Sequence, residues 1–273
     1  MTRVDTYRRY GCSVAFVEVE NKHGDRSIGT AFHVGDGVFV TAKHVVARKR
    51  VLKLGTTVRH TLRDGAAQPD YGLPIEGVPE GPYLAERGTD VALLVLPSAA
   101  TLPAIPVGGH LDDWLGDEML LDSATVMGYP PVPFSGEPVL LAMRCEINGI
   151  IDKYTGGHPH FIVSAIARGG FSGGPVIHDA GFLVGIVTES LTRDEHPPEL
   201  GFMAVLSVEP IYNCLKRHNL MPACVKDGWD GLWDMDIRQM LRDGIAAGTV
   251  SAPHEFVAKV FSEDPWNVED EDE

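Results

Sequence analysis

The stretch Arg168-Gly-Gly-Phe-Ser-Gly-Gly-Pro-Val-Ile177 places four glycines around one serine, Ser172, and closes on a proline and two aliphatic residues. Glycine loses more conformational freedom on folding than any other residue, so a cluster of this kind is costly to order. Two interpretations follow from the residues alone. The segment is a flexible loop, or its backbone is shaped so that its own N–H groups take part in chemistry.

The composition predicts a large globular protein built from short strands. The 273 residues are enough for one large domain or for two lobes that share an interface, and 44% of them are hydrophobic. The 30 glycines and 19 prolines occur as turn residues along the chain, outside any low-complexity tract. This distribution is typical of many short strands joined by turns.

The net charge argues against two classes of partner. The formal charge is −15, from 23 basic and 38 acidic residues, so we expect no binding to nucleic acid and none to an anionic membrane. Part of this charge lies in the acidic run at residues 269–273. Such a run is either a solvated tail or a docking tag for a basic partner.

Targeting signals and cysteines bear on the location of the protein. The first twenty residues lack the apolar segment of a signal peptide, and no apolar run approaches the roughly 18–20 residues that span a bilayer. The cysteines show no metal-type spacing; they are Cys12, Cys145, Cys214 and Cys224. We therefore expect a cytoplasmic protein with reduced thiols and no cofactor.

Short apolar segments separated by glycine and proline predict most of the secondary structure. The spacing favours antiparallel barrels or a sandwich over a parallel sheet with crossover helices. Residues 35–37 (Gly-Asp-Gly) carry a hairpin turn signal. The expected strands are 13–20, 29–34, 38–41, 90–96, 124–127, 139–147, 161–165, 176–177, 182–188 and 202–206.

The pattern changes near Val208, where apolar residues take helical spacing. Residues 208–218 predict a helix with basic residues in its last turn, as the helix dipole prefers. Residues 235–247 and 254–262 predict further short helices. The sequence thus predicts a β-rich body at residues 1–218 and a helical C-terminal extension at residues 219–273.

Three residues have contexts that suit nucleophilic catalysis. His44 follows a strand, Asp90 opens the apolar run of 90–96, and Ser172 lies in the glycine-rich turn. Each alone is more often structural. Together they are what acyl transfer needs, because a serine hydroxyl attacks only when an imidazole takes its proton, and the imidazole needs a carboxylate to fix its tautomer. The N–H groups of Gly170 and Ser172 could stabilise the oxyanion that develops.

A family resemblance rests on these residues. The order His, Asp, Ser, the sequence G-F-S-G-G-P at 170–175 and T-A-K-H at 41–44 resemble the trypsin-like (chymotrypsin-fold) serine peptidases. Residues 29–46 are most similar to the bacterial, HtrA-like branch. The resemblance covers residues 11–212. It implies an all-β fold of two perpendicular six-stranded antiparallel β-barrels, with the active site in the cleft between them.

The resemblance also implies roles for individual residues. His44 is the general base, Asp90 its orienting carboxylate and Ser172 the nucleophile, while Gly170 and Ser172 supply the oxyanion hole. Residues 185–190 resemble the strand that pairs with the substrate backbone, and residues 201–205 resemble the next strand of the primary pocket. The substrate-binding residues implied are Ile166, Thr188, Glu189, Ser190 and Gly201.

Ile166 lies six residues before the nucleophile, where the resemblance places the pocket floor. An aliphatic floor offers no counter-charge to arginine or lysine, so we expect a small or medium apolar residue before the scissile bond. Glu189 could favour basic residues elsewhere in the substrate, but a solvated loop is the interpretation that we favour.

The sequence departs from the family pattern in three ways. Phe171 stands where digestive members have an aspartate that pairs with a cleaved N-terminus, so we expect control by a partner, by substrate or by loop rearrangement. The cysteines of the family disulfides are missing. The roughly 55 residues after the body are too few and too helical for a typical PDZ domain.

His158 and His160 raise the question of a metal site. No further ligand is spaced nearby in the sequence to complete one, so we predict a surface turn and no metal.

The prediction for the whole chain is a serine endopeptidase that forms an acyl-enzyme on a protein or peptide substrate, with a regulatory role. The C-terminal extension is the candidate surface for a regulatory protein partner. The alternative is a catalytically silent module that binds a protein in its cleft.

Overall fold

The computed structural model describes most of the chain as far as Val225. The described residues are 3–57, 74–112, 115, 117–151, 157–166, 169–190 and 202–225. The chain divides into two compact units, Met1–Lys226 and Asp227–Glu273. The second unit lies outside the described residues, and so do the helices expected at 235–247 and 254–262.

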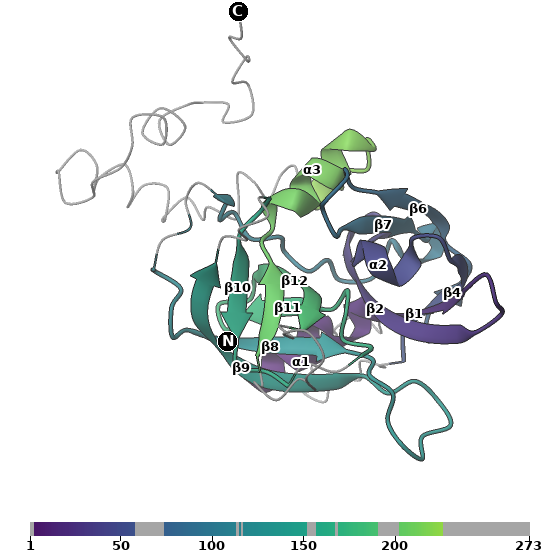
Figure 1. The fold of residues 1–273 in the computed structure, drawn as a ribbon, viewed down its shortest axis with the longest axis horizontal. Helices are drawn as coiled ribbons and strands as arrows, with labels where there is room; N and C mark the ends of the chain where they lie inside the picture. The colour runs from purple at the N-terminus through teal and green to yellow at the C-terminus, as the bar shows by residue number, and fades with distance from the viewer. Residues whose placement is uncertain are drawn as a thin grey trace, which may run out of the picture. The chain divides into compact units, whose positions relative to one another are not determined.

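The N-terminal lobe is a seven-stranded antiparallel sheet with the strand order β5-β4-β1-β2-β3-β7-β6 (Figure 1). The one-turn helix α2, Lys43–Val46, follows β3 directly. The strands of this sheet are β1 (Val14–Glu20), β2 (Arg26–Gly35), β3 (Val38–Thr41), β4 (Arg50–Gly55), β5 (Glu76–Gly77), β6 (Glu80–Leu84) and β7 (Ala92–Val95).

The turn between β2 and β3 shows why glycine is needed there. Gly35, Asp36 and Gly37 all have positive φ angles, of 125°, 51° and 77°. A Cβ on Gly37 would lie 2.6 Å from the carbonyl oxygen of Leu96. Burial lowers the pKa of His33, and its neutral ring accepts the Gly37 N–H at Nε2 (3.0 Å). The predicted hairpin is therefore confirmed.

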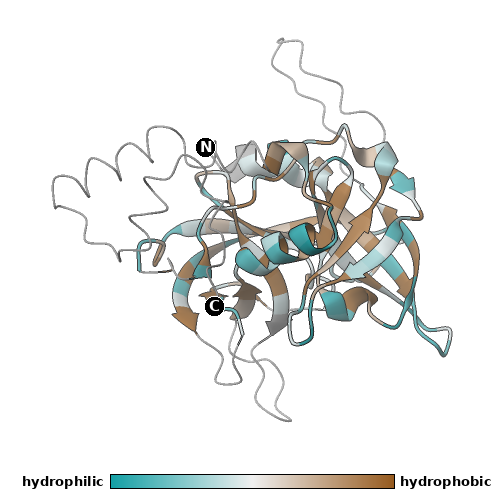
Figure 2. Cartoon of the chain, turned by 90° about the horizontal axis from the view of Figure 1, so that it is seen from above, coloured by the Kyte–Doolittle hydropathy of each residue, from teal (hydrophilic) through white to brown (hydrophobic). Residues whose placement is uncertain are grey.

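The C-terminal lobe is a closed six-stranded barrel with the strand order β10-β13-β12-β11-β8-β9. Its interior is filled by apolar side chains, among them Val126, Phe161, Phe171 and Val205, and Figure 2 shows hydrophobic colouring along the strands. The strands are β8 (Ser123–Gly128), β9 (Leu141–Ile151), β10 (His160–Val163), β11 (Pro175–His178), β12 (Leu183–Ser190) and β13 (Met203–Leu206).

The predicted two-lobed β architecture is confirmed, and every strand expected from the sequence is present. The N-terminal lobe differs in detail from the six-stranded barrel that the resemblance implies, because its described part is an open, curled sheet. Its edge strands are poor at further pairing: β5 has two residues, and Pro82 in β6 has no N–H to donate.

A linker and a helix hold the two lobes together. The linker begins at the short 3₁₀ helix η2 (Pro97–Ala99) and crosses from the N-terminal lobe, where Ile105 N–H donates to His33 O, to the C-terminal lobe, where Leu183 N–H donates to Pro106 O. Helix α3, Glu209–Arg217, follows β13 and returns to the N-terminal lobe. There His218 Nε2 lies 2.9 Å from Leu84 O.

Two terminal segments complete the described body. Helix α1, Arg3–Tyr10, and the 3₁₀ turn η1, Gly11–Ser13, precede β1, and the Tyr10 hydroxyl donates to Gly181 O of the C-terminal lobe. At the other end, Ala223 N–H donates to the Asp36 carboxylate (2.8 Å). None of the described helices has the length and apolar character needed to cross a membrane.

Thr30 of β2 connects the lobes through its hydroxyl and its N–H, and its carbonyl is bonded within its own lobe. Its hydroxyl donates to Gly170 O (2.6 Å) and accepts from Tyr129 N–H (2.9 Å). Its N–H donates to Ser172 O, and its carbonyl accepts from the Thr41 hydroxyl. Because Thr30 is fully buried, none of these bonds competes with water.

Replacing Thr30 by valine keeps the shape of the side chain and removes the hydroxyl. The Gly170 carbonyl and the Tyr129 N–H then lose their partner, so the free energy of unfolding should fall by about 2–4 kcal/mol. Urea unfolding of Thr30→Val measures this, with the exposed Thr101→Val as the matched control. An unchanged midpoint in Thr30→Val would contradict the bridging role.

Candidate active site

His44 and Asp90 are brought together by strand pairing. His44 lies in α2, just after β3, and Asp90 lies just before β7. Since β3 and β7 pair antiparallel, with Thr41 opposite Ala92, the end of one strand meets the start of the other. Two side chains 46 positions apart thus become neighbours.

Asp90 holds the ring and the backbone of His44 at once. One carboxylate oxygen lies 2.7 Å from His44 Nδ1, and the other accepts the His44 N–H at 2.8 Å. The Asp90 side chain is 25% exposed and that of His44 is 48% exposed. With Nδ1 engaged by the carboxylate, Nε2 is the nitrogen that remains for proton transfer.

Ser172 lies on a turn that is anchored in both lobes. Phe171, before it, is 1% exposed and packs in the core of the C-terminal barrel. Ser172 itself offers its carbonyl to Thr30 N–H of the N-terminal lobe. After it, Gly173 N–H donates to Val187 O at 2.7 Å. The serine is thus held between a buried side chain and a hydrogen-bonded turn.

The glycines of this turn are required by their surroundings. Gly170 and Gly173 have φ angles of 95° and 85°, where residues with a Cβ are strained. A Cβ on Gly170 would lie 2.5 Å from Tyr129 O, and one on Gly173 would lie 2.1 Å from Thr30 O. Gly174 has an ordinary φ, but its Cβ would lie 2.2 Å from Met127 O. The flexible-loop interpretation is therefore wrong.

The backbone donors of the turn divide into two groups. Gly173 and Gly174 donate to carbonyl oxygens of the protein. Within the described residues, the N–H groups of Gly170, Phe171 and Ser172 have no such acceptor. The oxyanion-hole assignment of Gly170 and Ser172 therefore stays a prediction from the family resemblance.

A cleft of about 720 Å³ contains both His44 and Ser172. The N-terminal lobe contributes residues 26–29, 44, 45 and 49 to its wall, and the C-terminal lobe contributes residues 129–132, 135–139, 169, 170 and 172. Between these described side chains, no hydrogen bond links the Ser172 hydroxyl to His44. The structure therefore joins His44 to Asp90 directly and places Ser172 in the same cleft.

A family model described as a trypsin-like peptidase domain matches residues 29–186, more than half of the chain. The chain belongs to the trypsin-like peptidases. Among curated proteins, no sequence match is found.

Solved structures of peptidases share the fold. The HtrA-type protease AlgW with tripeptide is 19% identical, with a TM-score of 0.57, over 80% of this chain and 65% of AlgW. The serine endoprotease from Yersinia pestis is 19% identical, with a TM-score of 0.55, over 84% of this chain and 68% of the endoprotease. The active form of Rv3671c protease from M. tuberculosis is also 19% identical, with a TM-score of 0.55, over 77% of this chain and 82% of the Rv3671c chain. This trypsin-like peptidase chain spans less than two thirds of the length of AlgW.

The primary pocket of this peptidase chain stays a prediction. Ile166 follows β10 and is 55% exposed. Thr188 of β12 is buried, and its hydroxyl has no hydrogen-bond partner within the described residues. Glu189 and Ser190 end β12, but their side chains lie outside the described part, as does Gly201.

Sequence reasoning missed the residues that support the site from a distance. Thr30 and Tyr129 carry no motif, although Thr30 lies in the stretch that resembles the HtrA-like branch. Burial raises the pKa of Tyr129 to about 12, so its hydroxyl stays protonated and donates to Val14 O (3.2 Å). It also lies 3.0 Å from the Thr57 hydroxyl. These bonds add a second link between the lobes.

Gly173→Ala tests the packing of the turn that carries Ser172. Its Cβ would meet the Thr30 carbonyl at a positive φ, so the free energy of unfolding should fall by at least about 2 kcal/mol. Gly169→Ala is the matched control, because no atom lies within 4 Å of a Cβ built there. Chemical denaturation measures the free energy of unfolding of both variants. Equal values would show that the turn is not closely packed.

Proposed function

We propose that this trypsin-like peptidase is an active serine endopeptidase whose catalytic residues are His44, Asp90 and Ser172. The observation that carries the proposal is the bond of 2.7 Å between His44 Nδ1 and Asp90 Oδ2, in a cleft that Ser172 also lines. A histidine oriented by a carboxylate beside a serine is the arrangement that activates a hydroxyl for attack.

The proposed reaction begins when Ser172 Oγ attacks the scissile carbonyl carbon and His44 Nε2 takes the hydroxyl proton. Asp90 stabilises the imidazolium that forms. The oxyanion accepts hydrogen bonds from the N–H groups of Gly170 and Ser172, and one such donor contributes about 3–4 kcal/mol to the transition state. His44 then gives its proton to the leaving amine, which leaves an acyl-enzyme on Ser172. A water molecule, deprotonated by His44, hydrolyses this ester.

One observation favours the second candidate, a silent module that binds a protein in the same cleft. The Ser172 hydroxyl does not hydrogen-bond to His44 within the described residues, so the pair must approach before chemistry begins. Catalytic hydrogen bonds of this kind often tighten only when substrate is bound. The enzyme is therefore the function we propose, with substrate or a partner bringing the pair together.

We further propose that the peptidase is cytoplasmic and regulatory, with a dedicated protein substrate and a partner bound through the C-terminal extension. The acidic composition and the four cysteines, which are all thiols, motivate the location. Phe171 supports control by substrate or partner. A phenylalanine has no carboxylate that could pair with a cleaved N-terminus, and this side chain is 1% exposed in the barrel core. Ile166 and the ends of β12 and β13 would form a pocket for a small or medium apolar residue.

A fluorophosphonate probe tests the proposed nucleophile. It should label the wild-type protein on Ser172, and Ser172→Ala should abolish labelling. Asp90→Asn should slow labelling by several orders of magnitude, since an equivalent substitution in a related triad costs roughly 10⁴-fold in kcat by fixing the wrong imidazole tautomer. If the wild type stays unlabelled even with candidate partners added, the silent module is the correct function.

Mapping of new protein termini in cells tests the substrate proposals. Cells that contain the wild type should show a small set of cleavage sites that are missing with Ser172→Ala, each preceded by a small or medium apolar residue. The aliphatic side chain of Ile166 provides no charge to hold a basic one. Cleavage after arginine would refute the pocket assignment, and hundreds of unrelated substrates would refute the dedicated role.

A further inference from the structure

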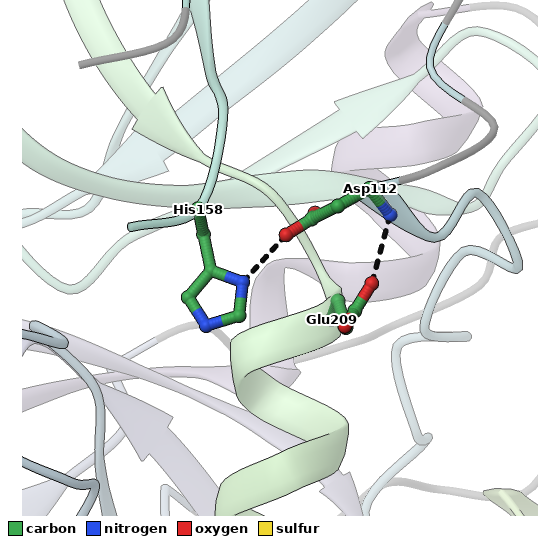
Figure 3. A group of neighbouring side chains, drawn as sticks. All are labelled: Asp112, His158 and Glu209. Carbon is green, nitrogen blue, oxygen red and sulfur yellow. Dashed lines mark hydrogen bonds and ion pairs between the residues drawn. The ribbon is translucent and has the colours of Figure 1, made fainter. Parts of the chain in front are cut away.

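Three potential metal ligands meet at the junction of the linker, the C-terminal barrel and α3. They are Asp112 of the linker, His158 just before β10, and Glu209, the first residue of α3 (Figure 3). His158 Nδ1 and one oxygen from each carboxylate all lie within 4.8 Å of one another. No second metal ligand for His158 can be recognised in the sequence, because the two carboxylates lie 46 positions before it and 51 positions after it.

Hydrogen bonds already orient both carboxylates. The hydroxyl of Ser207, a fully buried residue, donates to one oxygen of Asp112 at 2.6 Å. The backbone N–H of Asp112 donates to Glu209 Oε2 at 2.9 Å. The second oxygen of Asp112 lies 2.5 Å from His158 Nδ1. Outer-shell bonds of this kind hold metal ligands in position and are part of a metal site's affinity.

The charge at this junction favours a cation. The carboxylates of Asp112 and Glu209 both lie beside His158, and so bring two acidic groups to one point. Asp112 and His158 are largely withdrawn from solvent, with side chains 14% and 18% exposed. The local field is therefore negative, in a place where water screens it only in part.

We propose that Asp112, His158 and Glu209 form a binding site for a divalent transition-metal ion of the zinc class. One imidazole nitrogen and two carboxylate oxygens suit zinc, whereas calcium and magnesium prefer oxygen ligands alone. The ion takes the place between Nδ1 and Oδ2 that a proton holds in the hydrogen bond, and the proton leaves to solvent.

The geometry needs only small movements and leaves room for a fourth ligand. Zinc–ligand bonds of about 2.0–2.1 Å in a tetrahedron separate ligand atoms by roughly 3.3 Å. Glu209 therefore has to approach by at most about 1.5 Å, and Asp112 and His158, now 2.5 Å apart, have to separate by about 0.8 Å. Its carboxylate can turn on its side chain. A cavity of about 210 Å³ is lined by His158 and by residues along α3 from Pro210 to Arg217, and beside His158 it offers space for a bound water.

The site would add metal–ligand bonds to three segments that already meet through hydrogen bonds, among them those of the Tyr212 hydroxyl in α3 with Val107 O and Gly108 O of the linker. Asp112 belongs to the connection between the lobes, and α3 carries His218 to Leu84 of the N-terminal lobe. An ion bound to the native state and not to the unfolded chain raises stability by mass action. The inferred role is therefore structural and does not depend on the proposed peptidase activity.

Equilibrium dialysis of the full chain against zinc chloride tests the proposal. The wild type should bind one zinc ion per chain, and zinc should raise its Tm by several degrees. Glu209→Gln and Asp112→Asn should each weaken zinc binding by at least about 10–100-fold. Glu209→Gln keeps an oxygen that accepts the Asp112 N–H, whereas Asp112→Asn keeps an acceptor for only one of its two hydrogen bonds, with Ser207 or with His158. The Tm of each variant without zinc shows whether it folds.

The chain offers a matched control. His178 Nε2 lies 3.1 Å from Asp122 Oδ2, a second histidine–aspartate pair for which no third ligand converges within the described residues. His178→Gln should bind zinc like the wild type. Three results would each overturn the proposal. The wild type does not bind zinc, or Glu209→Gln binds zinc as tightly as the wild type, or zinc binding is lost only in His44→Ala. The cluster would then be a proton-bridged pair alone.

Discussion

The hydrogen bonds of Thr30 are the constraint on which the rest of the structure depends. His44 and Asp90 belong to the N-terminal lobe and Ser172 to the C-terminal lobe, so the cleft has a defined geometry only if the lobes are fixed relative to each other. Thr30 N–H binds the carbonyl of Ser172 itself, and the Thr30 hydroxyl binds the carbonyl of Gly170. Thr30 thereby ties the turn that carries Ser172 to the other lobe, and the bonds of Tyr129 add a second link.

The turn is held from its other side by packing. Phe171 lies in the barrel core and Gly173 donates to β12, so the residues on both sides of Ser172 are tied to the C-terminal lobe. Glycine at 170 and 173 permits the backbone angles that this double attachment needs. The outcome is a serine on a closely packed turn.

Much of the fold was predictable because apolar runs and turn residues act locally. β3, β7 and the hairpin at 35–37 follow directly from their sequences. β4 and β6 were missed because their side chains are largely half-exposed or exposed, so no apolar run marks them. β4 is a strand because it pairs with β1, where Leu54 lies opposite Val17. Helix α1 was missed because its eight residues include three arginines and no apolar stripe.

The sequence by itself determined what depends on neighbours in the chain: most of the strands, the glycine-rich turn and the three residues of the proposed triad. Tertiary structure alone decided what depends on distant segments. The pairing of β3 with β7 joins His44 to Asp90, Thr30 connects the lobes, and Asp112, His158 and Glu209 meet at one point. The reason is physical, because side-chain contacts across a fold depend on how strands pair and lobes pack, and no local pattern records those distances.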